Sequence, residues 1–182
     1  MSHPVILEMK GIVKSFGPVK ALKGVDLDLR AGEVHALMGE NGAGKSTLMK
    51  VLTGIHDANE GTIHYNGKQV TYSKPKDAME DGIVIVHQEL NMMNHLTVAQ
   101  NIFIGREEFR HNWLIDDGAS IKKAKKLFDL LKLDINPTEK VGNLTVGKQQ
   151  MVEIAKALSM DAKVIVFDET TAALTESEIN EL

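Results

Sequence analysis

The sequence predicts an α/β fold with a mostly parallel sheet, an N-terminal antiparallel β subdomain and a helical subdomain. Two apolar runs, Ile83–Val86 and Val164–Phe167, are typical of strands buried on both faces of a parallel sheet. The alternation over Gly24–Arg30 is typical of a strand with one solvated face, which favours antiparallel pairing. Between the two apolar runs the spacing of apolar residues changes to three and four, which indicates helices.

Composition bounds the class of protein. The 182 residues are 43% hydrophobic and 25% charged, as in an ordinary globular domain. A net charge of −4 gives no footprint of nucleic-acid binding, and the absence of cysteine excludes disulfides and thiolate metal sites. Met1–Pro4 does not begin a secretory signal, and no 18-residue apolar run occurs, so a membrane role would run through a partner.

We predict one domain over 1–182. Its core would comprise 1–90 and 161–182, and its helical subdomain 91–160. The first strand is predicted over Ile6–Phe16, and Gly17-Pro18 is a turn signal. After the alternating strand, Val34–Met38 reads as a buried strand, and Gly61–Gly67 as a strand that turns at Asn66-Gly67 into Gln69–Thr71.

The stretch Gly39–Thr47 matches G-x-x-x-x-G-K-[ST] between a predicted strand and a predicted helix. Glycines allow backbone N–H groups to converge on phosphate oxygens, and the helix N-terminus favours the same anion. Lys45 would reach the β- and γ-phosphates, and the Ser46 hydroxyl would bind Mg²⁺. A glycine-rich turn without a ligand is the alternative. The candidate phosphate-binding residues are Gly39, Glu40, Asn41, Gly42, Ala43, Gly44, Lys45, Ser46 and Thr47, and the core is therefore predicted to be of the P-loop NTPase type.

Three helices are predicted in the helical part. The first covers Leu96–Ile104, and the second runs from a cap at Asp116 or Asp117 to about Lys132. We read Glu107–Asp117 as a loop, and a third helix is predicted over Lys148–Met160. The second helix carries four lysines that indicate a solvated face, with a phosphate or lipid patch as the alternative: Lys122, Lys123, Lys125 and Lys126.

The strand Val164–Phe167 ends in Asp168-Glu169, which is typical of the second half of a phosphate-loop nucleotide site. Asp168 would hold Mg²⁺ through its hydration shell, and Glu169 would act as general base on the attacking water. Two acids after a strand can also simply begin a loop. A last helix is predicted from Thr175, whose side chain would form a capping box with that of Glu178.

Three further positions are candidates for the same site. Gln88 follows the strand Ile83–Val86 and could sense Mg²⁺ or water, although such glutamines are usually solvated. Phe16 could stack on adenine or could pack in the core. Thr145 and Gly147 lie at a predicted helix N-terminus, where an anion can bind.

Together these motifs resemble those of the ATP-binding cassette (ABC) ATPases. The sequence around these motifs, such as Ala36–Asn41 and Val152–Leu158, is most similar to that of ATP-binding subunits of ribose- and galactose-type monosaccharide importers. The resemblance covers nearly the whole chain. It assigns the phosphate loop to Gly39–Thr47, the glutamine loop to Gln88 and the signature loop to Leu144–Lys148. It makes Phe16 the aromatic that stacks on adenine, and Thr171–Thr175 resembles the loop after the acidic pair.

The resemblance implies the ABC ATPase fold, incomplete at the C-terminus, with ATP and Mg²⁺ as cofactors. ATP would lie between the phosphate loop of one cassette and the signature loop of a second, where Thr145 and Gly147 would contact it. Lys45, Gln88 and Glu169 would be catalytic, and Ser46, Gln88 and Asp168 would serve the metal. The partners would be membrane permease subunits and, indirectly, an extracytoplasmic sugar-binding protein, with no nucleic acid. The protein would be peripheral on the cytoplasmic side of the inner membrane.

The sequence departs from the family pattern at three places. The signature reads Leu-Thr-Val-Gly-Lys in place of Leu-Ser-Gly-Gly-Gln, so Val146 adds a branched side chain and Lys148 a charge. Thr170 stands where the family has proline after Asp-Glu. None of the seven histidines follows Asp168-Glu169, so the switch histidine is expected beyond Leu182. We therefore expect the first of two cassettes, cut before its last strands, with weak or no turnover alone.

Two other functions remain open at this point. A non-transport ABC protein could act on ribosomes or DNA, although the short stretch between Gln88 and Leu144 disfavours the coiled-coil DNA class. A nucleotide-binding module without turnover would fit the altered signature loop.

Overall fold

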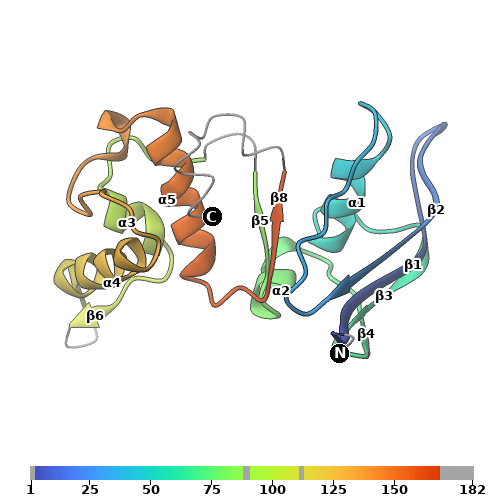
Figure 1. Cartoon of the computed structure of the whole chain (residues 1–182), viewed down its shortest axis with the longest axis horizontal. Coiled ribbons are helices and arrows are strands. Elements are labelled where there is room, and N and C mark those ends of the chain that lie inside the picture. Colours follow the sequence, from blue (N-terminus) through green and yellow to red (C-terminus); the bar gives the residue numbers. More distant parts are fainter. Residues whose placement is uncertain (1–2, 88–90, 111–112, 169–182) are drawn as a thin grey trace. The chain divides into compact units, whose positions relative to one another are not determined.

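In the computed structural model, residues 3–87, 91–110 and 113–168 are described. The chain divides into two compact units, an N-terminal unit (Met1–Ile83) and a C-terminal unit (Val84–Leu182) (Figure 1). Each unit is taken by itself below. Over the described ranges, no helix has the length and apolar character needed to cross a membrane.

A four-stranded antiparallel sheet forms the N-terminal unit, with strand order β2-β1-β3-β4. Its strands are β1 (Val5–Phe16), β2 (Val19–Arg30), β3 (Glu60–Tyr65) and β4 (Lys68–Val70). Met9 is opposite Leu27 on β2 and Ile63 on β3, so β1 is paired along both of its edges. Leu7, Met9 and Ile12 on this strand are fully buried. The predicted antiparallel β subdomain is therefore confirmed.

A glycine sets the close approach of β3 to β1. Gly61 has φ +101°, and a Cβ there would lie 2.6 Å from the carbonyl oxygen of Lys10. The register of the β1–β3 pair shifts between Lys10 and Val13, as at a β-bulge. No larger residue fits this bulge without moving backbone.

Two helices complete the N-terminal unit. Helix α1 (Lys45–Leu52) follows the glycine loop, and its buried face consists of Leu48, Val51 and Leu52. Helix α2 (Pro75–Glu80) was not predicted from the sequence. Its signal was Pro75, because proline is favoured in the first turn of a helix.

The predicted buried strand Val34–Met38 is wrong. The segment has no strand assignment, and Val34 and Met38 are 99% and 89% exposed. Its apolar composition predicts burial, but a strand also needs a neighbour for its backbone groups. Within the described residues, no backbone hydrogen bond joins 34–38 to another segment.

The C-terminal unit packs three helices with the two-stranded sheet of β5 (Ile83–Val86) and β8 (Val164–Phe167). The helices are α3 (Val98–Phe103), α4 (Asp117–Leu130) and α5 (Val146–Leu158), and a 3₁₀ turn, η1 (Val141–Asn143), precedes α5. Figure 1 shows the three helices side by side. Their shared core contains Ile102, Phe128 and Met151, each at most 2% exposed. All three predicted helices are confirmed.

Caps set where these helices begin. The Thr97 hydroxyl accepts from Gln100 N at 3.2 Å, and the Gln100 side chain accepts from Thr97 N at 3.0 Å. This reciprocal pair is a capping box, which satisfies two backbone donors at the start of α3. Asp116 caps α4 through Ala119 N at 3.0 Å, as the sequence predicted.

Two details of the C-terminal unit differ from expectation. The region read as a loop contains a short hairpin of β6 (Phe109–Arg110) and β7 (Leu114–Ile115). The single tryptophan of the chain, Trp113, lies just before β7 and is 73% exposed. Of β8, which was expected to be buried on both faces, Val164 is buried, Ile165 and Val166 are half-buried and Phe167 is exposed.

Candidate functional site

The glycine loop closes on its own lysine. Lys45 Nζ donates to the carbonyl oxygens of Gly39 at 2.7 Å and Glu40 at 3.1 Å. Ala43 N donates to Glu40 O at 3.1 Å, which tightens the turn before α1. The ammonium is therefore held at the mouth of the loop, at the first residue of α1, where an anion would meet both the charge and the helix N-terminus.

Only glycine fits at the end of this loop. Gly44 is the N-cap of α1 with φ +94°, and a Cβ there would lie 2.7 Å from Ala21 O and 2.8 Å from Leu22 Cδ2. The loop thus sits directly on β2. This approach fixes the start of α1 against the sheet, and so fixes Lys45 and Ser46 in its first turn.

Phe16 ends β1 in the same unit and is 44% exposed, so it is not a core residue. Its ring lies 5.1 Å from the His56 ring at an interplanar angle of 73°, an edge-on contact. Lys14 Nζ lies over the ring, 5.3 Å from its centroid. The partly exposed ring and the glycine loop therefore both belong to the N-terminal unit.

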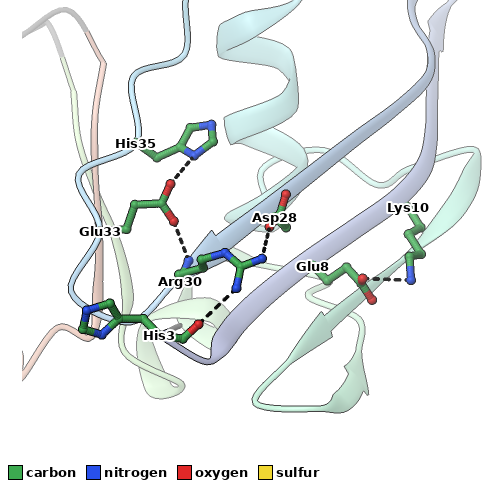
Figure 2. A network of polar contacts seen from close by, with 7 residues as sticks. All are labelled: His3, Glu8, Lys10, Asp28, Arg30, Glu33 and His35. Carbon is green, nitrogen blue, oxygen red and sulfur yellow. Dashed lines mark hydrogen bonds and ion pairs between the residues drawn. The ribbon is translucent and has the colours of Figure 1, made fainter. Parts of the chain in front are cut away.

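A polar network closes the turn that leads into Val34–Met38 (Figure 2). Glu33 Oε2 accepts from Arg30 N at 2.9 Å, and Glu33 Oε1 lies 3.0 Å from His35 Nδ1. Arg30 Nη1 donates to His3 O at 3.1 Å and so ties the N-terminal segment to the same turn. The hydrogen bond from Arg30 N, and then that from His35, lower the pKa of the Glu33 carboxyl.

The signature loop (Leu144–Lys148) begins α5 in the C-terminal unit. Thr145 is the N-cap, and its hydroxyl accepts from Lys148 N at 3.4 Å. Gly147 follows in the first turn, and Val146 between them is 57% exposed. Lys148 Nζ donates to Asp134 O at 3.1 Å, so its charge is held against the preceding loop.

The acidic strand end is placed only in part. Asp168 follows β8, and its backbone N donates to Val86 O at 3.1 Å. The carboxyl ends of β5 and β8 therefore lie together, as in a parallel pair. Gln88 and Glu169, which follow these two ends, lie outside the described residues, as do Thr170 and Thr171–Thr175.

The available donors suit a magnesium ion by type. Ser46 offers a hydroxyl beside the loop lysine, and Asp168 a carboxylate at a strand end, and oxygen ligands of this kind are those that Mg²⁺ takes. In the described ranges no group of three or more histidine or acidic side chains is gathered for a metal. Ser46 and Asp168 lie in different units.

Sequence reasoning missed Asn101, which organises the segment after Gln88. It is 2% exposed, and its Nδ2 donates to Met93 O at 3.1 Å and Thr97 O at 3.0 Å. Val141 N donates to Leu96 O at 3.1 Å, which pins the same segment to the turn before the signature loop. The available signal was a polar residue inside an apolar helix pattern.

A groove of about 470 Å³ opens between the ends of the helices in the C-terminal unit. Its lining mixes apolar side chains with three cationic ones and one acidic one, among them Leu127, Leu130, Arg106 and Asp161. Arg106 donates to Ile102 O at 2.8 Å and to Ser159 O at 3.0 Å, and burial lowers its pKa. The guanidinium is thus fixed in place by neutral oxygens.

A glycine loop followed by a helix that begins with a lysine, in a chain that combines strands and helices, defines the class of protein as an α/β nucleotide-site fold. The chain matches the ABC transporter family model over residues 22–172 and belongs to that family. In the solved structures it is similar to a nucleotide-free ATP-binding cassette from an ABC transporter. That likeness has a TM-score of 0.84 at 34% identity and covers 98% of this chain and 74% of the other. The predicted ABC ATPase fold is therefore confirmed.

Curated relatives agree with this family. The chain is 54% identical over 180 residues to the putative ribose/galactose/methyl galactoside import ATP-binding protein 1 of Burkholderia lata. It is 53% identical over 178 residues to the ribose import ATP-binding protein RbsA of Geobacillus kaustophilus. These alignments cover 98% and 97% of this chain, but only 35% and 36% of the relatives. The chain thus spans about a third of their length.

Proposed function

We propose that the chain binds ATP with Mg²⁺ at Gly39–Thr47 and forms the first cassette of a subunit that hydrolyses ATP to power monosaccharide import. The observation that carries the proposal is the contact of Lys45 Nζ with Gly39 O and Glu40 O at the start of α1. These carbonyls hold the ammonium where the β- and γ-phosphates of a nucleotide would take their place. The sugar-import names of the relatives support the physiological role.

The N-terminal unit would supply the first half of the nucleotide site. Lys45 would exchange its hydrogen bonds to the two carbonyl oxygens for hydrogen bonds to phosphate oxygens. The new bonds would be stronger because the acceptor is charged. Ser46 would coordinate Mg²⁺, and Phe16 would stack on the base. Mg²⁺ would neutralise charge on the phosphates during transfer to water.

The C-terminal unit would supply the remaining groups. Asp168 would hold Mg²⁺ through water, Glu169 would accept the proton of the attacking water, and Gln88 would contact both. Thr145 and Gly147 would meet the γ-phosphate bound to a second cassette, because the first turn of α5 offers a hydroxyl and backbone N–H groups. The site would therefore be complete only in a pair of cassettes.

The groove of the C-terminal unit suits a segment of the permease that carries a carboxylate. The leucines of its lining would accept apolar side chains, and the fixed guanidinium of Arg106 would pair with the acid. Docking there would place the protein on the cytoplasmic face of the inner membrane, with the extracytoplasmic sugar-binding protein on the other side. The import names of the relatives do not favour a ribosome- or DNA-associated role.

A titration tests nucleotide binding. A fluorescent ATP analogue with Mg²⁺ is titrated into wild type, Lys45→Ala and Lys50→Ala. Lys50 lies in the last turn of the same helix, and its substitution controls for loss of positive charge. We expect Lys45→Ala to weaken nucleotide binding by about tenfold or more, which is the effect of losing a hydrogen bond to a charged group. We expect Lys50→Ala to leave the affinity unchanged. Equal affinity of wild type and Lys45→Ala would refute the site.

A further inference from the structure

The segment that follows α1 grips the end of β1 at several points. Lys14 Nζ donates to Asp57 O at 2.6 Å, and Ser15 N donates to Asn59 Oδ1 at 2.7 Å. Asn59 N returns a bond to Val13 O at 2.8 Å. The last residues of β1 are thus bound to one short segment, His56–Asn59, by both backbone and side-chain hydrogen bonds.

Two side chains of this assembly face Phe16. The His56 ring meets the Phe16 ring edge-on at 5.1 Å, a geometry that the ring quadrupoles favour. The Lys14 ammonium lies over the ring, and its bond to Asp57 O keeps it there. A phenyl ring at the end of a strand would otherwise be free to change rotamer, and here it is held on two sides.

The same segment is tied to the glycine loop through α1. Ile55 N and His56 N both donate to Lys50 O, at 2.9 and 3.0 Å, so the segment continues directly from the last turn of the helix. The helix begins at Lys45, only two turns earlier. The position of Phe16 and that of Lys45 are therefore set by one rigid element.

We propose that Lys14 and His56 are positioning residues that hold the Phe16 ring for stacking on the base of a bound nucleotide. The inference rests on the proposed function. Lys14 covers one face of the ring, and the base stacks on the surface that stays exposed. Because α1 links His56 to Lys45, the clamp also sets the separation between the base and the triphosphate.

The test separates the base from the phosphates. Full-chain wild type, Phe16→Ala, His56→Ala and Lys14→Met are titrated by competition with a fluorescent ATP analogue, using Mg²⁺ with ATP or with inorganic tripolyphosphate. Lys68→Met on β4 is the matched charge control, since Lys68 is exposed on a strand at the far edge of the sheet. His56→Phe and Lys14→Arg restore the ring contact and the charge.

We expect Phe16→Ala to weaken ATP about tenfold, as for loss of one stacked base, and the two clamp variants about threefold, as for loss of one aromatic or cation contact. Affinity for tripolyphosphate stays at the wild-type value in all of them. His56→Phe and Lys14→Arg recover most of the ATP affinity, which a variant that had merely unfolded could not do.

Each other outcome overturns a defined part. If Phe16→Ala weakens ATP but the clamp variants do not, the clamp is wrong and the proposed nucleotide site stands. If the clamp variants weaken ATP and tripolyphosphate alike, their effect is on the fold of the loop and the positioning role is wrong. If Lys14→Met strengthens ATP, the ammonium competes with the base for the ring, which also overturns the proposal.

Discussion

Asn101 and Met93 exchange two hydrogen bonds. The Asn101 side chain accepts from Met93 N at 2.8 Å and donates to Met93 O at 3.1 Å. The Asn101 amide therefore bonds both backbone groups of Met93, as a neighbouring strand would do in a sheet. It fixes the path of the chain that leads into α3.

Replacing Asn101 by alanine is therefore expected to destabilise the C-terminal unit. The substitution removes both hydrogen bonds to Met93, and each contributes about 1 kcal/mol to the free energy of unfolding. Urea unfolding followed by far-UV circular dichroism measures the loss, with Lys122→Ala on the exposed face of α4 as control. An unchanged midpoint for Asn101→Ala would mean that water replaces the side chain.

Gly44 and Gly42 give a matched pair of glycines. Both have positive φ, but a Cβ at Gly42 meets nothing within 4 Å, whereas one at Gly44 meets Ala21 O at 2.7 Å. Gly42→Ala should cost about 1 kcal/mol of left-handed strain. Gly44→Ala should cost more than about 2 kcal/mol, because backbone must also move, and should weaken ATP binding.

Thermal unfolding and the fluorescent-nucleotide titration compare the two glycine variants. Equal effects of Gly42→Ala and Gly44→Ala on both readouts would show that α1 can shift away from β2 without loss.

The altered signature loop predicts low turnover. Val146 is exposed and Lys148 is held by Asp134 O, so neither side chain is needed for the core of α5. Val146→Gly with Lys148→Gln in the full-length protein should raise permease-stimulated phosphate release severalfold, since it removes bulk and charge where a γ-phosphate would approach. Unaltered release would mean that this loop does not limit hydrolysis.

The assigned general base predicts a separation of binding from chemistry. Glu169→Gln in the full-length protein should keep ATP affinity and lower phosphate release by two orders of magnitude or more, about the contribution of general-base catalysis. Retained steady-state turnover would place the base elsewhere, or would assign turnover to a second cassette. Glu176→Gln serves as a charge-matched control.

The carboxyl of Glu33 predicts an acid-sensitive turn. Its pKa is lowered from 4.5 by the hydrogen bond from Arg30 N and by His35. A lowered folded-state pKa means that the stabilisation is present above the unfolded value and is lost as pH falls through the folded one. Wild type and Glu33→Gln should differ in melting temperature at pH 6 and converge in acid as the pH falls through the lowered pKa, as differential scanning fluorimetry would measure. Because the group is exposed, we expect a small difference, and a gap that persists in acid would contradict the assignment.

Most of the fold was predictable, because β1 and β2 alternate and the three main helices carry caps and apolar stripes at helical spacing. Val34–Met38 was predicted wrongly because its apolar composition favours burial but does not indicate whether a neighbouring strand is present to pair with it. Asn101 was missed because its role lies in bonds to backbone, which a polar residue inside an apolar helix pattern does not by itself specify. The roles of Lys45 and Phe16 were predicted from a motif and a resemblance. The contact of His56 with Phe16 could not be predicted, because only the fold brings the end of β1 to the turn after α1.

The tryptophan beside the hairpin β6–β7 determines what intrinsic fluorescence can report. Trp113 beside it is the chain's single tryptophan and belongs to the C-terminal unit, whereas the glycine loop and Phe16 belong to the N-terminal unit. Its intrinsic emission therefore reports a solvent-exposed position in the unit that does not contain the glycine loop. An emission change on addition of ATP would then show that nucleotide binding affects the C-terminal unit, and the unmodified protein would carry its own reporter of that effect.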